Sequence, residues 1–231
     1  MEIDLVFTPG ELAYCDLRGK TAVVIDVFRF TTAALSALEA GAAGIFVVKE
    51  VEQAFQMREQ DPSLILAGER QALKVPGFDF GNSPLEFTEE VRGKRIIWCT
   101  TNGTNAVAMA QQAEEVILAS LRSAEVVAQY VQEQKRDCIL IPAGLRGRYS
   151  LEDTWCAGYI AQHFHGGVLS DSAKAALCIM QAWDVKDLKA SRHGQVLASL
   201  ALTADVEYCL ALNASRNVIK QDPISGWCSL I

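Results

Sequence analysis

Residues 95–104 read Arg-Ile-Ile-Trp-Cys-Thr-Thr-Asn-Gly-Thr and join an apolar, strand-like run to a tight polar turn. A helix-like stretch, residues 105–113, follows directly. The backbone N–H groups of the turn should therefore point into the crevice at the carboxyl end of a strand, where anions bind well. Turns of this kind occur in every α/β protein and often bind nothing, so this one alone leaves a structural role equally open.

The rest of the chain repeats this alternation. The strands that we predict cover residues 3–7, 22–27, 44–49, 64–67, 95–99, 115–118 and 138–142. The helices that we predict cover residues 32–40, 51–60, 83–91, 105–113 and 123–134, and from residue 150 onward the pattern is almost wholly helical, through 157–164, 173–183 and 205–212. The order indicates an α/β fold in three layers, with a mostly parallel or mixed sheet flanked by helices and a helix-rich C-terminal third. With no linker or repeat, we expect residues 1–231 to form a single domain.

Composition narrows the classes of function. The chain is half apolar and carries a net charge of −7 without any basic run. Nucleic acid and anionic membrane are therefore set aside as partners, because both need clustered Lys and Arg. The first four residues include two acids where a signal peptide carries positive charge, and no apolar run reaches the roughly 18 residues that span a bilayer, so we expect a cytoplasmic protein. The seven cysteines form no C-x-x-C pair and are expected to be reduced.

Acids and bases gather where the predicted strands end. Asp26 ends the run 23–26 and Arg29 follows three residues later, while Glu69 and Arg70 repeat the theme after residues 64–67. A carboxylate at a strand end can bind a hard cation, and a neighbouring arginine can grip an oxyanion with two N–H groups. The alternative is structural: an Asp26–Arg29 ion pair that holds the turn, and a surface pair at Glu69–Arg70.

A third cluster follows the strand 138–142. Ser150 has the character of a helix N-cap, and Glu152 and Asp153 lie in the first turn, where the helix dipole alone favours acids. Arg146 and Arg148 lie in a glycine-containing loop beside these acids, which is more than capping requires, although a solvated basic loop is the alternative. His193 can act as a proton donor or anion contact, but a lone histidine is more often structural.

Six stretches together resemble the 2-phosphosulfolactate phosphatase family, in the family's order and over most of the chain. They are residues 24–32 (VIDVFRFTT), 68–70 (GER) with 77–84 (GFDFGNSP), 100–104 (TTNGT), 141–144 (IPAG), 150–153 (SLED) and 205–209 (DVEYC). The resemblance implies one 2-phosphosulfolactate phosphatase-like α/β domain, residues 1–231. It also implies a Mg²⁺-dependent acid phosphatase that converts 2-phospho-3-sulfolactate to 3-sulfolactate and phosphate in coenzyme M biosynthesis. Two departures stand out: Ala201 replaces an expected glycine, and residues 217–231 do not follow the family's usual end.

The residues and the resemblance together indicate a mechanism. We expect some of Asp26, Glu69, Glu152 and Asp153 to bind Mg²⁺, since this cation takes one or two carboxylates plus waters and substrate oxygens. The substrate-binding residues that we predict are Thr101, Asn102, Gly103, Thr104, Arg146, Arg148 and His193. The catalytic residues that we predict are Asp26, Arg29 and Asn102.

In this scheme, Arg29 and the turn 101–104 hold phosphoryl oxygens, and Arg146 or Arg148 meets the sulfonate or carboxylate. The sequence does not decide between attack by a metal-bound water and a phospho-Asp26 intermediate. Cys99 ranks last as a nucleophile, because no arginine-rich phosphate loop follows it.

Two other classes of function fit the same residues. One is a phosphatase for another phosphorylated hydroxy acid, and the other is a non-catalytic sensor of an anionic metabolite. As partners we expect a small anionic phosphorylated substrate, without nucleic acid or membrane, and we leave homo-oligomerisation open.

Overall fold

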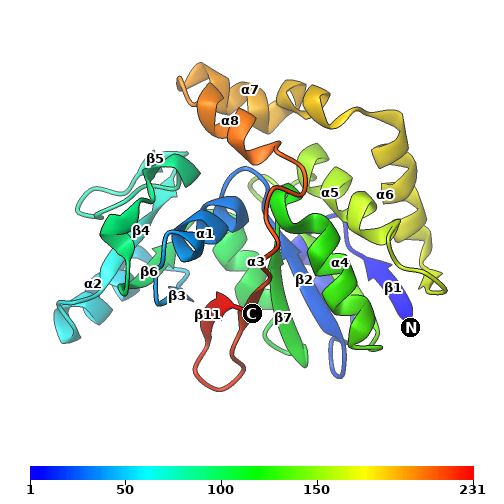
Figure 1. Cartoon of the computed structure of the whole chain (residues 1–231), viewed down its shortest axis with the longest axis horizontal. Helices are drawn as coiled ribbons and strands as arrows, with labels where there is room; N and C mark the ends of the chain where they lie inside the picture. Colours follow the sequence, from blue (N-terminus) through cyan, green and yellow to red (C-terminus); the bar gives the residue numbers. More distant parts are fainter.

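A computed structural model describes all 231 residues, and a mixed sheet of 11 strands forms its centre (Figure 1). The strands are β1 (Glu2–Leu5), β2 (Thr21–Ile25), β3 (Gly44–Val47), β4 (Ile65–Arg70), β5 (Leu73–Lys74), β6 (Arg95–Cys99), β7 (Glu115–Ala119), β8 (Cys138–Pro142), β9 (Val168–Leu169), β10 (Ile219–Gln221) and β11 (Trp227–Leu230). They lie in the order β5-β4-β6-β3-β11-β10-β7-β2-β8-β1-β9. Only the pairings of β5, β10 and β11 are antiparallel.

Helices cover both faces of this sheet. They are α1 (Phe30–Glu39), α2 (Val51–Gln60), α3 (Gly103–Met109), α4 (Ala124–Glu133), α5 (Leu151–Ala161), α6 (Asp171–Ala182), α7 (Arg192–Ser199) and α8 (Thr203–Cys209). Short 3-10 helices are η1 (Pro9–Tyr14), η2 (Pro84–Glu86), η3 (Glu89–Val91), η4 (Leu121–Ser123) and η5 (Val185–Ala190). No helix combines the length and the apolar character that a membrane crossing needs. The predicted α/β class is confirmed.

Alternation along the central strands divides the core into two layers. In β2, Val23 and Ile25 pack with residues of α4 and α5, whereas Ala22 and Val24 pack on the opposite face with α1 and α3. All of β2 is buried, which is the pattern of a parallel strand covered on both sides. The seven predicted strands are all present, and residues 95–99 and 138–142 have the predicted bounds. All seven cysteines are free, as expected.

The helix predicted over residues 83–91 is wrong. The structure has two separate 3-10 turns there, η2 and η3, with an extended Phe87 between them. Phe87 is buried and packs on Trp98, with ring centroids 5.0 Å apart. Glu86 accepts a hydrogen bond from the N–H of Gly81 instead of closing a capping box. Tertiary packing against the sheet therefore overrides the local helix signal.

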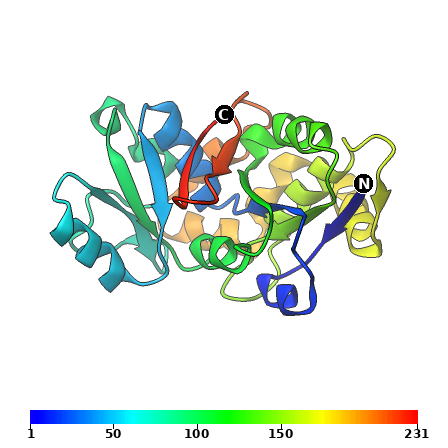
Figure 2. The same cartoon turned by 90° about the horizontal axis from the view of Figure 1, so that it is seen from below.

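The almost wholly helical pattern expected from residue 150 onward is also wrong at its end. β10 and β11 form an antiparallel hairpin that pairs with β7 on one side and β3 on the other. Figure 2 shows this hairpin, in red, between the two groups of parallel strands. These strands have only three and four residues, so their periodicity is too short to be recognised in the sequence.

Candidate active site

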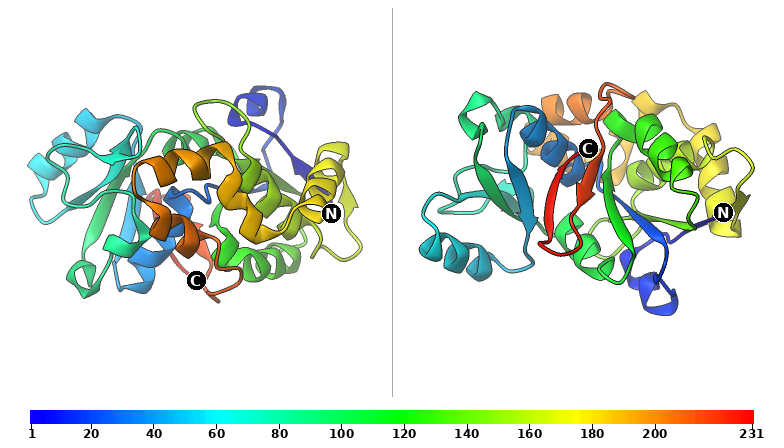
Figure 3. Two further views of the ribbon diagram at one scale, coloured as in Figure 1. Left: turned by 90° about the horizontal axis from the view of Figure 1, so that it is seen from above. Right: turned by 60° about the horizontal axis from the view of Figure 1, so that its bottom comes forward.

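A pocket at the carboxyl ends of the parallel strands collects most of the predicted site residues. The space that it lines, counted together with open solvent at its mouth, is about 490 Å³, and α7 supplies one wall. Figure 3 (left) shows α7 and α8, in orange, over this end of the sheet. The pocket is lined by Asp26, Phe28 and Arg29 after β2, Glu69, Gln71 and Ala72 at the end of β4, Asn82, Thr101 and Asn102 after β6, Leu145 and Arg146 after β8, and His193, Val196 and Leu197 of α7.

Curvature of the sheet brings these loops together. Four strands separate β6 from β2, so a flat sheet would hold the two about 24 Å apart. In the structure, however, Phe30 at the start of α1 meets Trp98 of β6 edge to face, with ring centroids 5.7 Å apart. Both side chains are fully buried in one core layer. The twist and bend of the sheet therefore build the pocket from segments that are distant in sequence.

Asp26 lines the pocket and lies near other titratable side chains. It follows β2 and is only 4 % exposed. Its Oδ1 accepts a hydrogen bond from the N–H of Phe30 at 3.3 Å, while no protein group donates to Oδ2. Burial raises the pKa of Asp26 to about 6; His193 opposes this rise, and Glu69 and Glu152 add to it. An acid with this surplus of nearby negative charge is suited to a cation or to proton exchange.

Gly103 lies in close contact with Asp26 and Phe30. A Cβ atom at this position would lie 2.6 Å from Oδ2 of Asp26 and closer still to the ring of Phe30. Real Cβ atoms do not occur at such distances, so only glycine fits between the two side chains. The glycine of the predicted anion turn is thus required by contact with the acid.

Arg29 pairs with Asp205 and not with Asp26. Its Nη1 donates to Oδ2 of Asp205 at 2.6 Å, and its Nη2 donates to the carbonyl of Ala72 at 2.8 Å. The hydroxyl of Ser83 donates to the other Asp205 oxygen at 2.7 Å. The suggested Asp26–Arg29 ion pair is therefore absent, and Asp205 fixes the guanidinium in the pocket wall. Because the partners are 176 residues apart, no local signal could have shown this pair.

Two of the predicted metal ligands brace the loops. The carboxylate of Glu69 accepts hydrogen bonds from the N–H groups of Thr101 and Ala72, both at 2.7 Å. Asp153 accepts from the N–H of Val27 at 2.8 Å and from that of Gly144 at 3.1 Å. Glu69 still lines the pocket, whereas Asp153 is buried behind it. Burial raises the pKa of Asp153 well above its usual value, and the neighbouring acids add to the rise.

Glu152 and His193 form a buried pair. Nδ1 of His193 lies 3.0 Å from Oε1 of Glu152, while Oε2 of Glu152 has no partner although it is completely buried. Burial alone would raise the pKa of Glu152, but the hydrogen bond and charge of His193 lower it. The edge of the His193 ring meets Phe28, which fixes its plane. This oxygen is the only completely inaccessible acid oxygen without a partner, and Glu152 itself is not among the residues that line the pocket.

The turn 101–104 has fewer free N–H groups than expected. The N–H of Thr101 donates to Glu69, and that of Thr104 donates to the Thr100 hydroxyl. The N–H groups of Asn102 and Gly103 have no protein acceptor. Neither Gly103 nor Thr104 is among the residues that line the pocket. The two middle residues of the turn are therefore the ones that remain available to an anion.

A tight hairpin turn presents Arg146 to the pocket. Leu145 and Arg148 exchange backbone hydrogen bonds, and the two residues between them, Arg146 and Gly147, have φ angles of 52° and 73°. Positive φ at both central positions is the geometry of a type I′ turn, in which arginine is unusual. The side-chain oxygen of Asn102 accepts the N–H of Arg146 at 2.8 Å and so ties this turn to the anion turn.

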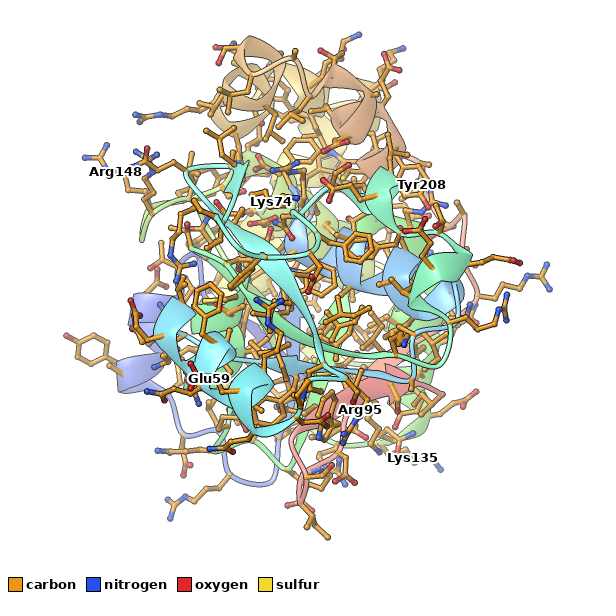
Figure 4. The ribbon with its side chains drawn as sticks, turned by 90° about the vertical axis from the view of Figure 1, so that its left-hand side faces the viewer. Glu59, Lys74, Arg95, Lys135, Arg148 and Tyr208 are labelled. Carbon is orange, nitrogen blue, oxygen red and sulfur yellow. The ribbon has the colours of Figure 1, made fainter.

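Arg148 points away from the pocket. It does not line the pocket, and Figure 4 shows its side chain extending outward from the ribbon. Arg70 also turns away: it donates to the carbonyls of Glu69 and Lys49 and to the sulfur of Cys99. Burial raises the pKa of the Cys99 thiol, and this disfavours the thiolate that a nucleophile needs.

Comparison with known proteins identifies relatives of this chain. A family model described as 2-phosphosulpholactate phosphatase matches residues 6–223. The chain belongs to the 2-phosphosulfolactate phosphatase family. One family member, named probable 2-phosphosulfolactate phosphatase, from Clostridium perfringens (strain 13 / Type A), is 37 % identical over 223 residues, with 92 % of this chain and 90 % of the relative covered. Members with the same name from Carboxydothermus hydrogenoformans and Deinococcus radiodurans are 39 % and 40 % identical, over 92 % and 84 % of this chain and 90 % and 85 % of theirs.

Membership of the 2-phosphosulfolactate phosphatase family also gives a context for Ala201. Its φ of 60° is in the left-handed region that favours glycine. This is the position where the family resemblance predicted a glycine. The alanine therefore occupies a backbone conformation that a glycine would adopt without strain.

Several pocket residues were absent from the sequence-based candidates. Asp205 and Asn82 appeared there only as parts of family motifs, and Asn82 accepts the indole N–H of buried Trp98. Gln71 and Ala72 have φ angles of 56° and 67° and line the pocket beside Glu69. Nothing in their side chains signals a turn, so only the backbone geometry reveals them.

Replacing Asn102 by alanine should raise the KM for a phosphorylated substrate about 5- to 10-fold, because the Arg146 N–H loses its acceptor, worth about 1 to 1.5 kcal/mol. The hairpin turn would then be held less firmly over the pocket. Steady-state phosphate release measures this effect. Asn105→Ala, an exposed position in the same helix, is the matched control. An unchanged KM in Asn102→Ala would contradict the positioning role.

Proposed function

We propose that this protein hydrolyses 2-phospho-3-sulfolactate to 3-sulfolactate and phosphate in a Mg²⁺-dependent reaction. The observation that carries the proposal is that Asp26, Arg29 and His193 line one pocket together with Thr101 and Asn102 of the anion turn. Membership of a family of phosphatases and the names of the relatives supply the reaction and the substrate. That substrate suggests a step in coenzyme M biosynthesis, and we propose a cytoplasmic location.

Arg29 and the anion turn are proposed to bind the transferred phosphoryl group. Each terminal nitrogen of the guanidinium has two N–H bonds, of which Asp205 and the Ala72 carbonyl take one each. We propose that the remaining N–H groups of Arg29, together with those of Asn102 and Gly103, donate to the phosphoryl oxygens. Preorganised donors of this kind stabilise the charge on the phosphoryl oxygens in the transition state.

The acids of the pocket fit a Mg²⁺ ion in chemistry, although no three metal-ligating side chains form a ready cluster. Mg²⁺ takes one or two protein carboxylates and completes its shell with waters and phosphate oxygens. The buried, partnerless Oε2 of Glu152 and the free Oδ2 of Asp26 are two such donors, with Glu69 beside them. We propose that one or two of these three residues would hold the ion, which would neutralise phosphoryl charge, and that Asp153 positions the loops.

His193 is proposed to donate the proton that the leaving alkoxide oxygen of the substrate needs. Glu152 orients the His193 ring through Nδ1. Nε2 of His193 has no protein partner, so it is available to donate to the substrate in the pocket. Arg146 is proposed to contact the carboxylate or sulfonate of the substrate. Its left-handed backbone places this cationic side chain at the mouth of the pocket.

The test is phosphate release from purified protein, measured with and without Mg²⁺. We expect release that requires the ion and is fastest for 2-phospho-3-sulfolactate among phosphorylated hydroxy acids. Faster release from an ester without a sulfonate would assign another phosphorylated hydroxy acid as the substrate. Binding without release from any ester would instead indicate a sensor of an anionic metabolite.

A further inference from the structure

A second cavity adjoins the active pocket and shares three of its residues, Leu145, Arg146 and Val196. The space that it lines, counted together with open solvent, is about 870 Å³, and Arg148, Tyr149 and Arg192 complete its lining. We call this cavity the outer basin. Three of its six lining residues are arginines, and none is an acid. This concentration of positive charge is notable because the chain as a whole carries a net charge of −7.

The arginines of the outer basin differ from the others in having no partner. The chain has 12 arginines. Six form ion pairs with carboxylates, and two more donate to backbone carbonyls. The guanidinium groups of the remaining four, Arg146, Arg148, Arg192 and Arg216, have no protein acceptor. Three of these four line the outer basin, so its positive charge is not cancelled within the protein.

The backbone that carries these arginines is well fixed. Arg146 and Arg148 belong to the type I′ turn, whose ends exchange hydrogen bonds of 2.8 and 3.0 Å. Tyr149 packs against Phe7, with ring centroids 6.2 Å apart. Arg192 begins α7, directly before the buried His193. The backbone positions of the three arginines are therefore fixed around one opening.

The positive charge of the outer basin should attract anions from solution. A cavity of one charge sign with apolar walls concentrates field lines and raises the local concentration of oppositely charged solutes. The substrate proposed above carries a phosphate, a carboxylate and a sulfonate, and hence three to four negative charges near neutral pH. The net charge of the protein is −7, so such a solute gains local attraction where unpaired arginines gather, as they do in the outer basin.

We propose that the outer basin captures anionic substrate and that Arg148 and Arg192 act there before the chemical step. This inference rests on the proposed function. It gives Arg192 a role in substrate capture, and it assigns Arg148 to the entrance of the pocket instead of the site of chemistry. Arg146, which lines both cavities, links the outer basin to the active pocket. Capture by charge affects association and affinity, whereas it leaves the turnover of bound substrate unchanged.

The first test compares wild type with the Arg148→Gln/Arg192→Gln double variant at low and high salt. At about 20 mM salt we expect kcat/KM to fall about 10-fold, with kcat changed less than about 2-fold. At about 300 mM salt, where screening is strong, the two proteins should converge. Arg216→Gln is the matched control, because Arg216 is equally free of partners but lines a different cavity. Equal kcat/KM in wild type and the double variant would overturn the proposal, as would an equal loss in Arg216→Gln.

A binding experiment separates this inference from the proposed function. Calorimetric titration of the intact protein with 3-sulfolactate uses a probe that has the carboxylate and sulfonate but no phosphoryl group. We expect weaker binding in the double variant and unchanged binding in Arg216→Gln. This result would support the outer basin even if no ester were hydrolysed. Equal affinity in all three proteins would overturn the proposal even if hydrolysis occurred.

Discussion

Replacing Asp26 by asparagine is expected to lower Mg²⁺-dependent phosphate release by a factor on the order of 10³ or more. Asparagine has the same shape and can still accept the N–H of Phe30, so the local fold should persist. It cannot, however, supply the negative charge that faces the pocket from Oδ2. Steady-state kinetics with saturating Mg²⁺ measures the loss.

The same substitution should stabilise the metal-free protein near pH 7. Asp26 has a pKa of about 6 in the folded protein, against 3.8 for an ordinary aspartate, so the folded state binds its proton more tightly. The contribution of Asp26 to the free energy of unfolding is therefore largest below about pH 4, and it falls as the pH rises toward 6. Asparagine does not titrate, so Asp26→Asn removes this fall in the free energy of unfolding, which is on the order of 1 to 3 kcal/mol. Denaturant unfolding of both proteins in EDTA at pH 4 and pH 7 measures the difference.

Asp171→Asn is the control, because Asp171 is exposed at the start of α6 and far from the pocket. It removes one negative charge from the protein and should change neither activity nor the pH profile. If Asp26→Asn kept near wild-type activity, Asp26 would be neither a metal ligand nor a nucleophile. If it lost activity because it unfolded, the structural role of the carboxylate would dominate.

Gly103→Ala is expected to reduce kcat/KM at least about 100-fold and to destabilise the protein by about 1 to 3 kcal/mol. The added methyl group would overlap both Oδ2 of Asp26 and the ring of Phe30. Phe30 cannot yield, because it is fully buried against Trp98. Asp26 must therefore move away from its position in the pocket. A larger side chain, as in Gly103→Val, should cause a greater loss.

The matched control for this substitution is Gly10→Ala. A Cβ atom at Gly10 would meet only the Thr8 hydroxyl oxygen, at 3.9 Å. Thermal unfolding and phosphate release should both remain close to wild type in this variant. Wild-type kinetics in Gly103→Ala would show that the contact with Asp26 has no part in the reaction.

The sequence was sufficient to predict the parallel strands and most helices. Apolar runs such as residues 138–142 are bounded by polar turns, and their periodicity does not depend on the rest of the fold. The predicted helix 51–60 also has the observed bounds. The segment 83–91 could not be predicted, because the burial of Phe87 against Trp98 determines its shape.

The candidate site was predictable as a set of residue types but not as an arrangement. Asp26, Arg29, Glu69 and Asn102 stand at strand ends, and parallel strands bring such ends to one edge of the sheet. The partner of Arg29 depends on a fold-level contact with α8, which local sequence does not contain. Arg146 and Arg148 look equivalent in the sequence, yet the type I′ turn sends only Arg146 into the pocket.

The placement of β10 and β11 has a consequence for how the protein is made. Residues 219–230 follow all the other strands of this sheet in the chain, so the ribosome makes them after those strands, although they fill the middle of the sheet. Until then β3 and β7 each have an open edge, which is prone to pair with other chains. The nascent protein therefore holds two half-sheets that close only after synthesis of the hairpin, a late, long-range step that favours slow folding and dependence on chaperones.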